Sequence, residues 1–301
     1  MSASGTTRSR LQNKASQARV PRSFRGWALA TPPMLFTLVF FVAPLALLVL
    51  YSFGQMDILT FQISFGWTTE NWRTVFTGIY ASALLRSVAL SVVSTALCVL
   101  IAFPAALGMT RMPARMQNVL LLAVIVPYWI SFVVRNYAWL TLLGPEGMVT
   151  RCLEAVHVVD AGKDLRYTST AIVIGMVSSY LPLMILPIYV ALERIDPAVL
   201  DAAADLGLHG VHAFRRVVLP LSAPGLIAGV LLVGVPATGE YTIPAILGGG
   251  KTLMVGNVIR DKFLGVGDFP LGSALAATLM GLLIVVLVAS RKRIRQLEDV
   301  L

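Results

Sequence analysis

Long apolar stretches recur along the chain, separated by shorter polar segments. A membrane-spanning helix needs about 20 mainly apolar residues, and six runs reach that length. They are residues 27–53, 84–109, 118–143, 170–192, 224–247 and 269–290. The sequence lacks the alternating segments of about ten residues that mark a transmembrane barrel, and helices are the remaining way to satisfy the backbone in lipid. The pattern predicts an all-α membrane protein with six transmembrane helices.

Composition supports this prediction. Hydrophobic residues make up 57% of the 301 residues and charged residues only 13%, with a mean hydropathy of +0.79. A soluble domain carries about 25% charged residues, so a soluble globular protein is excluded.

The basic residues set the predicted orientation. Lys and Arg gather in the first 26 residues, in the segments after the second and fourth runs, and near the C-terminus. Cytoplasmic segments of membrane proteins are enriched in these residues, so both termini are expected in the cytoplasm. The net charge of +9 then reflects topology beside anionic lipid, and no nucleic-acid partner is expected. The predicted organisation is a basic tail (1–26), a transmembrane domain (27–290) and a second basic tail (291–301).

The segment at 193–222, on the predicted cytoplasmic side, has the pattern of two short helices. Asp196 is a candidate N-cap and Pro197 suits the first helical position, while Gly207 suits a helix end. A second short helix is expected over 211–218. Because this loop neither spans nor is covered by lipid, its amphipathic face predicts a protein partner. An alternative is a helix that lies flat on the bilayer surface.

The same loop carries a family motif. Asp201-Ala202-Ala203, then Gly207, nine further residues and Val217-x-Leu219-Pro220 resemble the EAA loop of bacterial ABC importer permeases, with Asp in place of the usual Glu and Val in place of Ile. The resemblance implies that the loop inserts as a coupling helix into a separate ATPase subunit. The docking residues it implies are Asp201, Ala202, Ala203, Gly207, Leu219 and Pro220.

Three further stretches, at 127–147, 179–196 and 236–250, resemble the spermidine/putrescine permeases of that superfamily. The resemblance implies a type I ABC importer permease-like fold in the bacterial inner membrane, forming half of the path for a small cationic solute. It implies as partners a second homologous permease, two ATPase subunits that bind ATP and Mg²⁺, and an extracytoplasmic solute-binding protein. Two alternatives stay open. The solute could be an amino-acid derivative, an opine or a metal chelate, or the chain could be a stand-alone secondary transporter or channel.

The sequence predicts no enzyme activity and no cofactor in this chain. It offers no set of nucleophile, base and orienting residue, and its three histidines lack metal-ligand spacing. The stretch at 245–252 resembles a relaxed phosphate-binding loop, but it follows a predicted membrane helix instead of a strand. ATP hydrolysis is therefore expected on another polypeptide.

Polar and aromatic residues inside the predicted spans mark a candidate path. Charged side chains within a membrane usually face a bundle interior or water, and aromatic faces attract ammonium groups. One hypothesis is a cation-attracting path; the alternative is an ion pair between Glu240 and Arg135, with the aromatic residues at the membrane interface. The candidate path residues are Glu240, Tyr128, Trp129, Tyr137, Tyr241 and Arg135.

Overall fold

The computed structural model describes residues 24–57, 62–64, 66–157, 160 and 162–298. The chain divides into two compact units, Met1–Leu50 and Tyr51–Leu301. Most of the predicted N-terminal tail, up to residue 23, lies outside the described residues.

The first predicted span is one helical rod that makes up the described part of the first unit. It consists of α2 (Phe24–Thr37), the π turn η1 (Leu38–Val42) and α3 (Ala43–Tyr51). Its apolar length, Thr31–Tyr51, is 21 residues, and the side chains of residues 31–47 are exposed. A continuous apolar surface of this kind needs lipid or another apolar surface against it.

The second unit begins with a small antiparallel ladder of β1 (Gln55–Met56) and β2 (Ile63–Ser64), which the sequence pattern did not predict because two-residue strands show no periodicity. Three of the predicted spans, the second, fourth and sixth, fall within single long helices. The helical elements are α4 (Glu70–Val75), α5 (Gly78–Thr110), α6 (Ala114–Ile125), the 3₁₀ turn η2 (Val126–Trp129), α7 (Phe132–Leu142), α8 (Met148–Ala155), α9 (Ser169–Glu193), α10 (Pro197–Asp205), α11 (Val211–Ala213), the π turn η3 (Phe214–Val218), α12 (Leu219–Thr238), α13 (Thr242–Leu247), α14 (Val255–Arg260), the π turn η4 (Asp261–Val266) and α15 (Phe269–Glu298).

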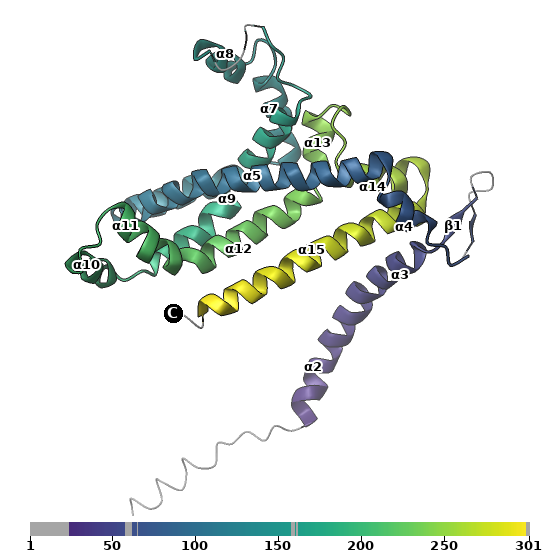
Figure 1. The fold of residues 1–301 in the computed structure, drawn as a ribbon, viewed down its shortest axis with the longest axis horizontal. Coiled ribbons are helices and arrows are strands. Elements are labelled where there is room, and N and C mark those ends of the chain that lie inside the picture. The colour runs from purple at the N-terminus through teal and green to yellow at the C-terminus, as the bar shows by residue number, and fades with distance from the viewer. Residues whose placement is uncertain (1–23, 58–61, 65, 158–159, 161, 299–301) are drawn as a thin grey trace, which may run out of the picture. The chain divides into compact units, whose positions relative to one another are not determined.

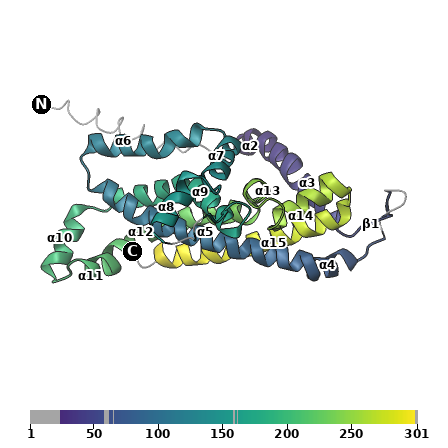
Figure 2. The same ribbon diagram turned by 90° about the horizontal axis from the view of Figure 1, so that it is seen from above.

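Helices α5, α9 and α12 pack against one another to form the core, and α15 lies along α12 (Figures 1 and 2). The residues between them are mostly small or unbranched. Cys98 and Ala102 of α5, Met184 of α9 and Val233 of α12 have no exposed surface. Lipid is as apolar as these side chains, so the hydrophobic effect does not drive membrane helices together. Close packing of this kind stabilises their association instead.

Two glycines bring α12 onto the backbone of α9. An ideal Cβ on Gly225 would lie 2.3 Å from the Cβ of Ala191 and 2.5 Å from the carbonyl oxygen of Pro187, and one on Gly229 would lie 2.7 Å from Sδ of Met184. Glycines four residues apart on one helix face are a common way for membrane helices to approach closely. No larger residue fits at Gly225 unless the two helices separate.

The third predicted span, 118–143, is bent. The chain runs through α6 and η2 and then turns by 93° into α7. Pro127 lies in η2, where it lacks a backbone N–H and restricts the residue before it. The apolar run at 118–143 hides this bend because hydropathy does not register backbone geometry.

The predicted second short helix at 211–218 does not end there. One helix of 28 residues runs from Val211 to Thr238 through η3 and past Pro220. A π turn shifts the backbone hydrogen-bond register by one residue, and Pro220, which has no N–H to donate, follows two residues after this turn.

The predicted fifth span, 224–247, is interrupted near its C-terminal end. The helix stops at Thr238, the chain crosses Gly239 and Glu240 in a non-helical conformation, and the short helix α13 begins at Thr242. This interruption, residues 239–241, is called the break below.

The two ends of the second unit are formed by different elements. The α10–α11 segment and the C-terminal end of α15 lie at one end, and α4 and β1 lie at the other (Figures 1 and 2). Helix α15 continues to Glu298, so most of the predicted C-terminal tail extends the last helix.

Candidate functional site

The hairpin formed by α10 and α11 (residues 196–213) has well-defined caps. The Asp196 carboxylate accepts a hydrogen bond from the N–H of Ala198 at 2.9 Å, and Pro197 takes the first helical position, as predicted. At the other end of α10, Gly207 has a φ of +81°. The N–H of Gly207 donates to Ala204 and that of Leu208 to Ala203, each at 2.9 Å, which is the Schellman arrangement. The sequence therefore fixes the shape of this hairpin locally.

The hairpin exposes apolar side chains at its tip. Leu206 is 82% and Val211 68% exposed, whereas Ala203 is only 6% exposed and packs within the chain. Of the other predicted docking residues, Asp201, Ala202 and Gly207 are exposed, and Leu219 and Pro220 are half-buried in the following helix.

The motif had not singled out Leu206 and Val211. Each is an apolar residue next to a predicted helix boundary, and this position is the sequence feature that could have indicated its exposure. Two strongly exposed apolar side chains on one short hairpin at an end of the unit mark an interaction surface.

The hairpin is joined to the bundle without a hinge. Its second helix continues into α12, so one helix connects the hairpin to the break. The ring of Phe214 packs edge-on against Phe103 of α5, with centroids 5.4 Å apart. At about 1.5 Å per residue, the helix carries a displacement of the hairpin over roughly 40 Å.

The break is organised around the Glu240 carboxylate. One carboxylate oxygen accepts a hydrogen bond from the Tyr180 hydroxyl at 2.5 Å. The other accepts from the backbone N–H groups of Tyr241, Thr242 and Ile243 at 3.0, 2.8 and 3.4 Å. Glu240 is 9% exposed, and a buried charge is stable only when such donors surround it. The carboxylate thus caps the start of α13 and ties it to α9.

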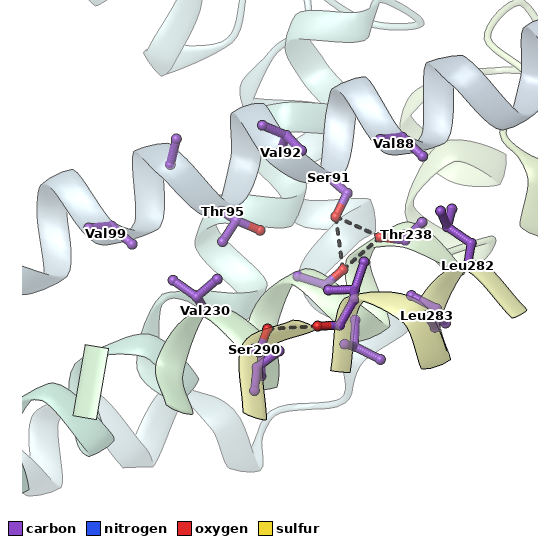
Figure 3. Close-up of a pocket in the computed structure, with 15 residues that line it drawn as sticks. Val88, Ser91, Val92, Thr95, Val99, Val230, Thr238, Leu282, Leu283 and Ser290 are labelled. Atoms are coloured by element: carbon purple, nitrogen blue, oxygen red, sulfur yellow. Dashed lines mark hydrogen bonds between the residues drawn. The ribbon is translucent and has the colours of Figure 1, made fainter. Parts of the chain in front are cut away.

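Further polar contacts hold the two sides of the break. The Thr238 hydroxyl lies 2.9 Å from that of Ser91 and 2.7 Å from the carbonyl oxygen of Gly234 (Figure 3). On the other side, Asn257 donates to the carbonyl oxygen of Tyr241 at 2.8 Å. A Cβ on Gly256 would lie 2.5 Å from the carbonyl oxygen of Gly239, so α14 rests directly on the break.

Arg135 stabilises the bend in the third span instead of pairing with Glu240. Its guanidinium donates to the carbonyl oxygens of Pro127 and Ile130 at 2.5 and 3.2 Å and lies over the ring of Tyr128, 5.5 Å from the centroid. Among the described residues, no ion pair joins Arg135 to Glu240. The ion pair that the sequence left open is therefore not formed.

The bend and the break are neighbours, because α13 packs against both α7 and α9. Gly175 of α9 marks the contact: a Cβ there would lie 2.4 Å from Leu247 of α13 and 3.2 Å from the side-chain oxygen of Asn136 on α7. The aromatic residues of the predicted path remain open on this side of the molecule, with Tyr128, Trp129, Tyr137 and Tyr241 exposed. Tyr180, the partner of Glu240, was not predicted as a site residue. The sequence feature that could have indicated it is a polar Ser-Tyr pair within the fourth predicted span.

A groove of about 390 Å³ lies between α5, α12 and α15 (Figure 3). Its walls are mainly aliphatic, and the polar groups among them are the hydroxyls of Ser91, Thr95, Thr238 and Ser290. A cation would find no counter-charge there, so this groove is unsuited to a cationic solute.

The family comparison decides between a transporter and the other classes. Residues 74–294 match the family described as the binding-protein-dependent transport system inner membrane component. The chain belongs to this family. The permease is thus a multi-pass transport subunit of the inner membrane and not an enzyme.

Individual relatives agree with this assignment. The permease is 39% identical to the spermidine/putrescine transport system permease protein PotB of Haemophilus influenzae, over 85% of this chain and 90% of the relative. It is 34% identical to PotB of Escherichia coli K12, over 83% and 92% of the two chains.

A solved structure supports the fold. A bacterial ABC transporter involved in the import of the acidic polysaccharide alginate has a chain that matches this permease with a TM-score of 0.68 and 16% identity, covering 95% of this chain and 99% of the other. The predicted all-α fold of a type I ABC importer permease is confirmed.

Proposed function

We propose that this permease is one transmembrane subunit of an ATP-driven importer of polyamines such as spermidine and putrescine. The observation that carries the proposal is its 39% and 34% identity, over most of both chains, to permeases of spermidine/putrescine transport systems. The importer would contain a second homologous permease, two ATPase subunits that bind ATP and Mg²⁺, and an extracytoplasmic solute-binding protein. The family description supports the last of these partners.

The hairpin of α10 and α11 is the surface on which an ATPase subunit docks. Asp201 and Ala202, with the newly identified Leu206 and Val211, offer an exposed, mixed apolar and acidic face. Ala203, Gly207, Leu219 and Pro220 act by shaping the hairpin and joining it to α12. The proposal therefore assigns the α10–α11 end of the bundle to the cytoplasm, together with the C-terminal end of α15. It assigns both termini to the cytoplasm as well, since the basic residues at 1–26 and 291–301 are typical of that side.

Closure of the ATPases on ATP would move the hairpin, and the continuous helix from Val211 to Thr238 would move the break with it. Small rigid-body shifts of this kind are sufficient when the bundle has two discrete arrangements. The Glu240 carboxylate keeps α13 attached to α9 through the Tyr180 hydroxyl. A shift of the C-terminal end of α12 would therefore change the break while α13 stays bound to α9.

The solute path runs beside the bend and the break. Trp129, Tyr137 and Tyr241 present exposed aromatic faces, each of which attracts an ammonium group by about 0.5–2 kcal/mol. Tyr128 lies at the same bend, with the Arg135 guanidinium over its ring. Glu240 supplies the negative charge behind them, and Arg135 fixes the bend on which Tyr128 and Trp129 lie.

The proposal is tested by uptake into proteoliposomes that contain the permease with its partner permease, ATPase and binding protein. ATP-dependent accumulation of radiolabelled spermidine or putrescine is expected. Uptake of an amino-acid derivative, an opine or a metal chelate in place of polyamine would overturn the solute assignment, and flux through the purified permease without ATP would overturn the importer assignment.

A further inference from the structure

A second connection between the hairpin and the rest of the bundle passes through Tyr189, near the end of α9. Its side chain is only 4% exposed, and its hydroxyl lies 3.0 Å from the Gln117 side-chain oxygen on α6 and 3.2 Å from a carboxylate oxygen of Glu193. A phenol carries one proton, so these two acceptors compete for it. One belongs to another element and one to the same helix.

Gln117 is itself fixed to the turn between α5 and α6. Its side-chain amide donates to the carbonyl oxygen of Met112 at 2.9 Å and to that of Thr110 at 3.3 Å. A chain of hydrogen bonds therefore runs from the end of α9 to the end of α5 and the start of α6.

The hairpin begins directly beside this chain. Asp196, the N-cap of α10, follows Glu193 by three residues, and a cavity of about 350 Å³ separates the α5–α6 turn from the base of the hairpin. Its lining includes Thr110 at the end of α5, Gln117 of α6, Glu193 of α9, and Pro197 and Leu200 of the hairpin. The Tyr189 hydroxyl bonds to two of the residues that line this cavity, Gln117 and Glu193, so it joins α6 to the end of α9 from which the hairpin starts.

Beyond Gln117, α6 leads through η2 to the bend that Arg135 holds. We infer that Tyr189 is a positioning residue that couples the docking hairpin to α6 and the bend, by donating its proton to Gln117 in one state of the transport cycle and to Glu193 in the other. The inference rests on the proposed function. It adds a second route of coupling, through α9 and α6, to the route along α12.

The test uses the complete importer in proteoliposomes and measures ATP hydrolysis and polyamine uptake in parallel. Tyr189→Phe removes only the hydroxyl. The loss of one hydrogen bond changes a conformational equilibrium by roughly two- to tenfold, so polyamine transported per ATP hydrolysed should fall by that factor while the ATPase still co-purifies. Gln117→Leu also removes the two hydrogen bonds to the turn, so it should lower this ratio at least as much, and adding Tyr189→Phe to it should cause no further loss.

The control is Ser178→Ala on the same helix. Among the residues that the structure describes, the Ser178 hydroxyl bonds within α9 alone, to the carbonyl oxygen of Gly175 at 3.0 Å, so transport per ATP in this variant should equal that of the wild type. A purely structural role for Tyr189 would lower the melting temperature and both rates together, leaving their ratio unchanged, and would overturn the inference. Additive effects of Tyr189→Phe and Gln117→Leu would also overturn it. Failure of the wild-type importer to take up polyamine overturns instead the proposed function.

Discussion

At the scale of single residues, Glu240 has a role that its type and position did not reveal. The sequence presents it as a lone acidic residue in a span, which favours either a cation path or an ion pair. The structure gives each of its oxygens a donor, in the Tyr180 hydroxyl and three backbone N–H groups. These contacts could not be predicted because they depend on the break that follows Thr238.

The cap predicts a stability effect at Glu240. Glu240→Gln removes the charge and replaces one acceptor with a donor that faces other donors. Hydrogen bonds to charged groups contribute about 1.5–3 kcal/mol, so a loss of stability of that order is expected, with a smaller loss for Tyr180→Phe. Thermal unfolding of the purified assembly measures both. Wild-type unfolding of Glu240→Gln, together with weaker polyamine uptake, would show instead that Glu240 acts on the solute alone.

Gly225 predicts a packing effect that a helical glycine in open space, such as Gly108, should not show. Gly225→Ala would place a methyl group 2.3 Å from Ala191 and 2.5 Å from the Pro187 backbone, and overpacking costs about 1–3 kcal/mol. Gly108→Ala is the control, since a Cβ on Gly108 has nothing within 4 Å. The melting temperature should fall for Gly225→Ala and not for Gly108→Ala; equal behaviour of the two variants would contradict the close contact between α9 and α12.

At the scale of elements, the sequence predicts helix ends that depend on a few neighbouring residues. Asp196, Pro197 and Gly207 begin and end α10 as predicted, because caps depend on a few neighbouring residues. Apolar composition is the same in a straight helix and in an interrupted one, so hydropathy shows neither the bend of the third span nor the break in the fifth. The local signals of these interruptions are prolines, Pro127 in the third span and Pro236 and Pro244 in the fifth. Arg135 and Glu240, which hold these two irregular segments, stood out in the sequence only as charges inside spans.

The cap of α10 predicts a graded effect at Gly207. With φ at +81°, alanine at this position would be strained by roughly 1–2 kcal/mol, whereas asparagine is tolerated in such caps. Gly207→Ala should therefore lower the amount of ATPase that co-purifies with the permease, and Gly207→Asn should lower it less. Equal retention by the wild type and Gly207→Ala would mean that the shape of the hairpin does not matter for docking.

At the scale of the whole molecule, the second unit links a docking hairpin at one end to a polar break and a bend near the candidate path. The sequence identified the hairpin through its motif, but the unbroken helix that joins it to the break became visible only in the structure. The account predicts that an ATPase subunit contacts the tip of this hairpin, where Leu206 and Val211 are exposed.

Site-directed cross-linking tests this claim most directly. Leu206→Cys, in a Cys152→Ser background because Cys152 is an exposed thiol, should cross-link to the ATPase in the assembled importer. Leu264→Cys is the matched control, since Leu264 is 79% exposed in η4, which belongs to neither the hairpin nor the helix that follows it. We expect Leu206→Cys to cross-link to the ATPase in high yield and Leu264→Cys not to cross-link to it. An intact assembly in which Leu206→Cys forms no cross-link to the ATPase would contradict the account.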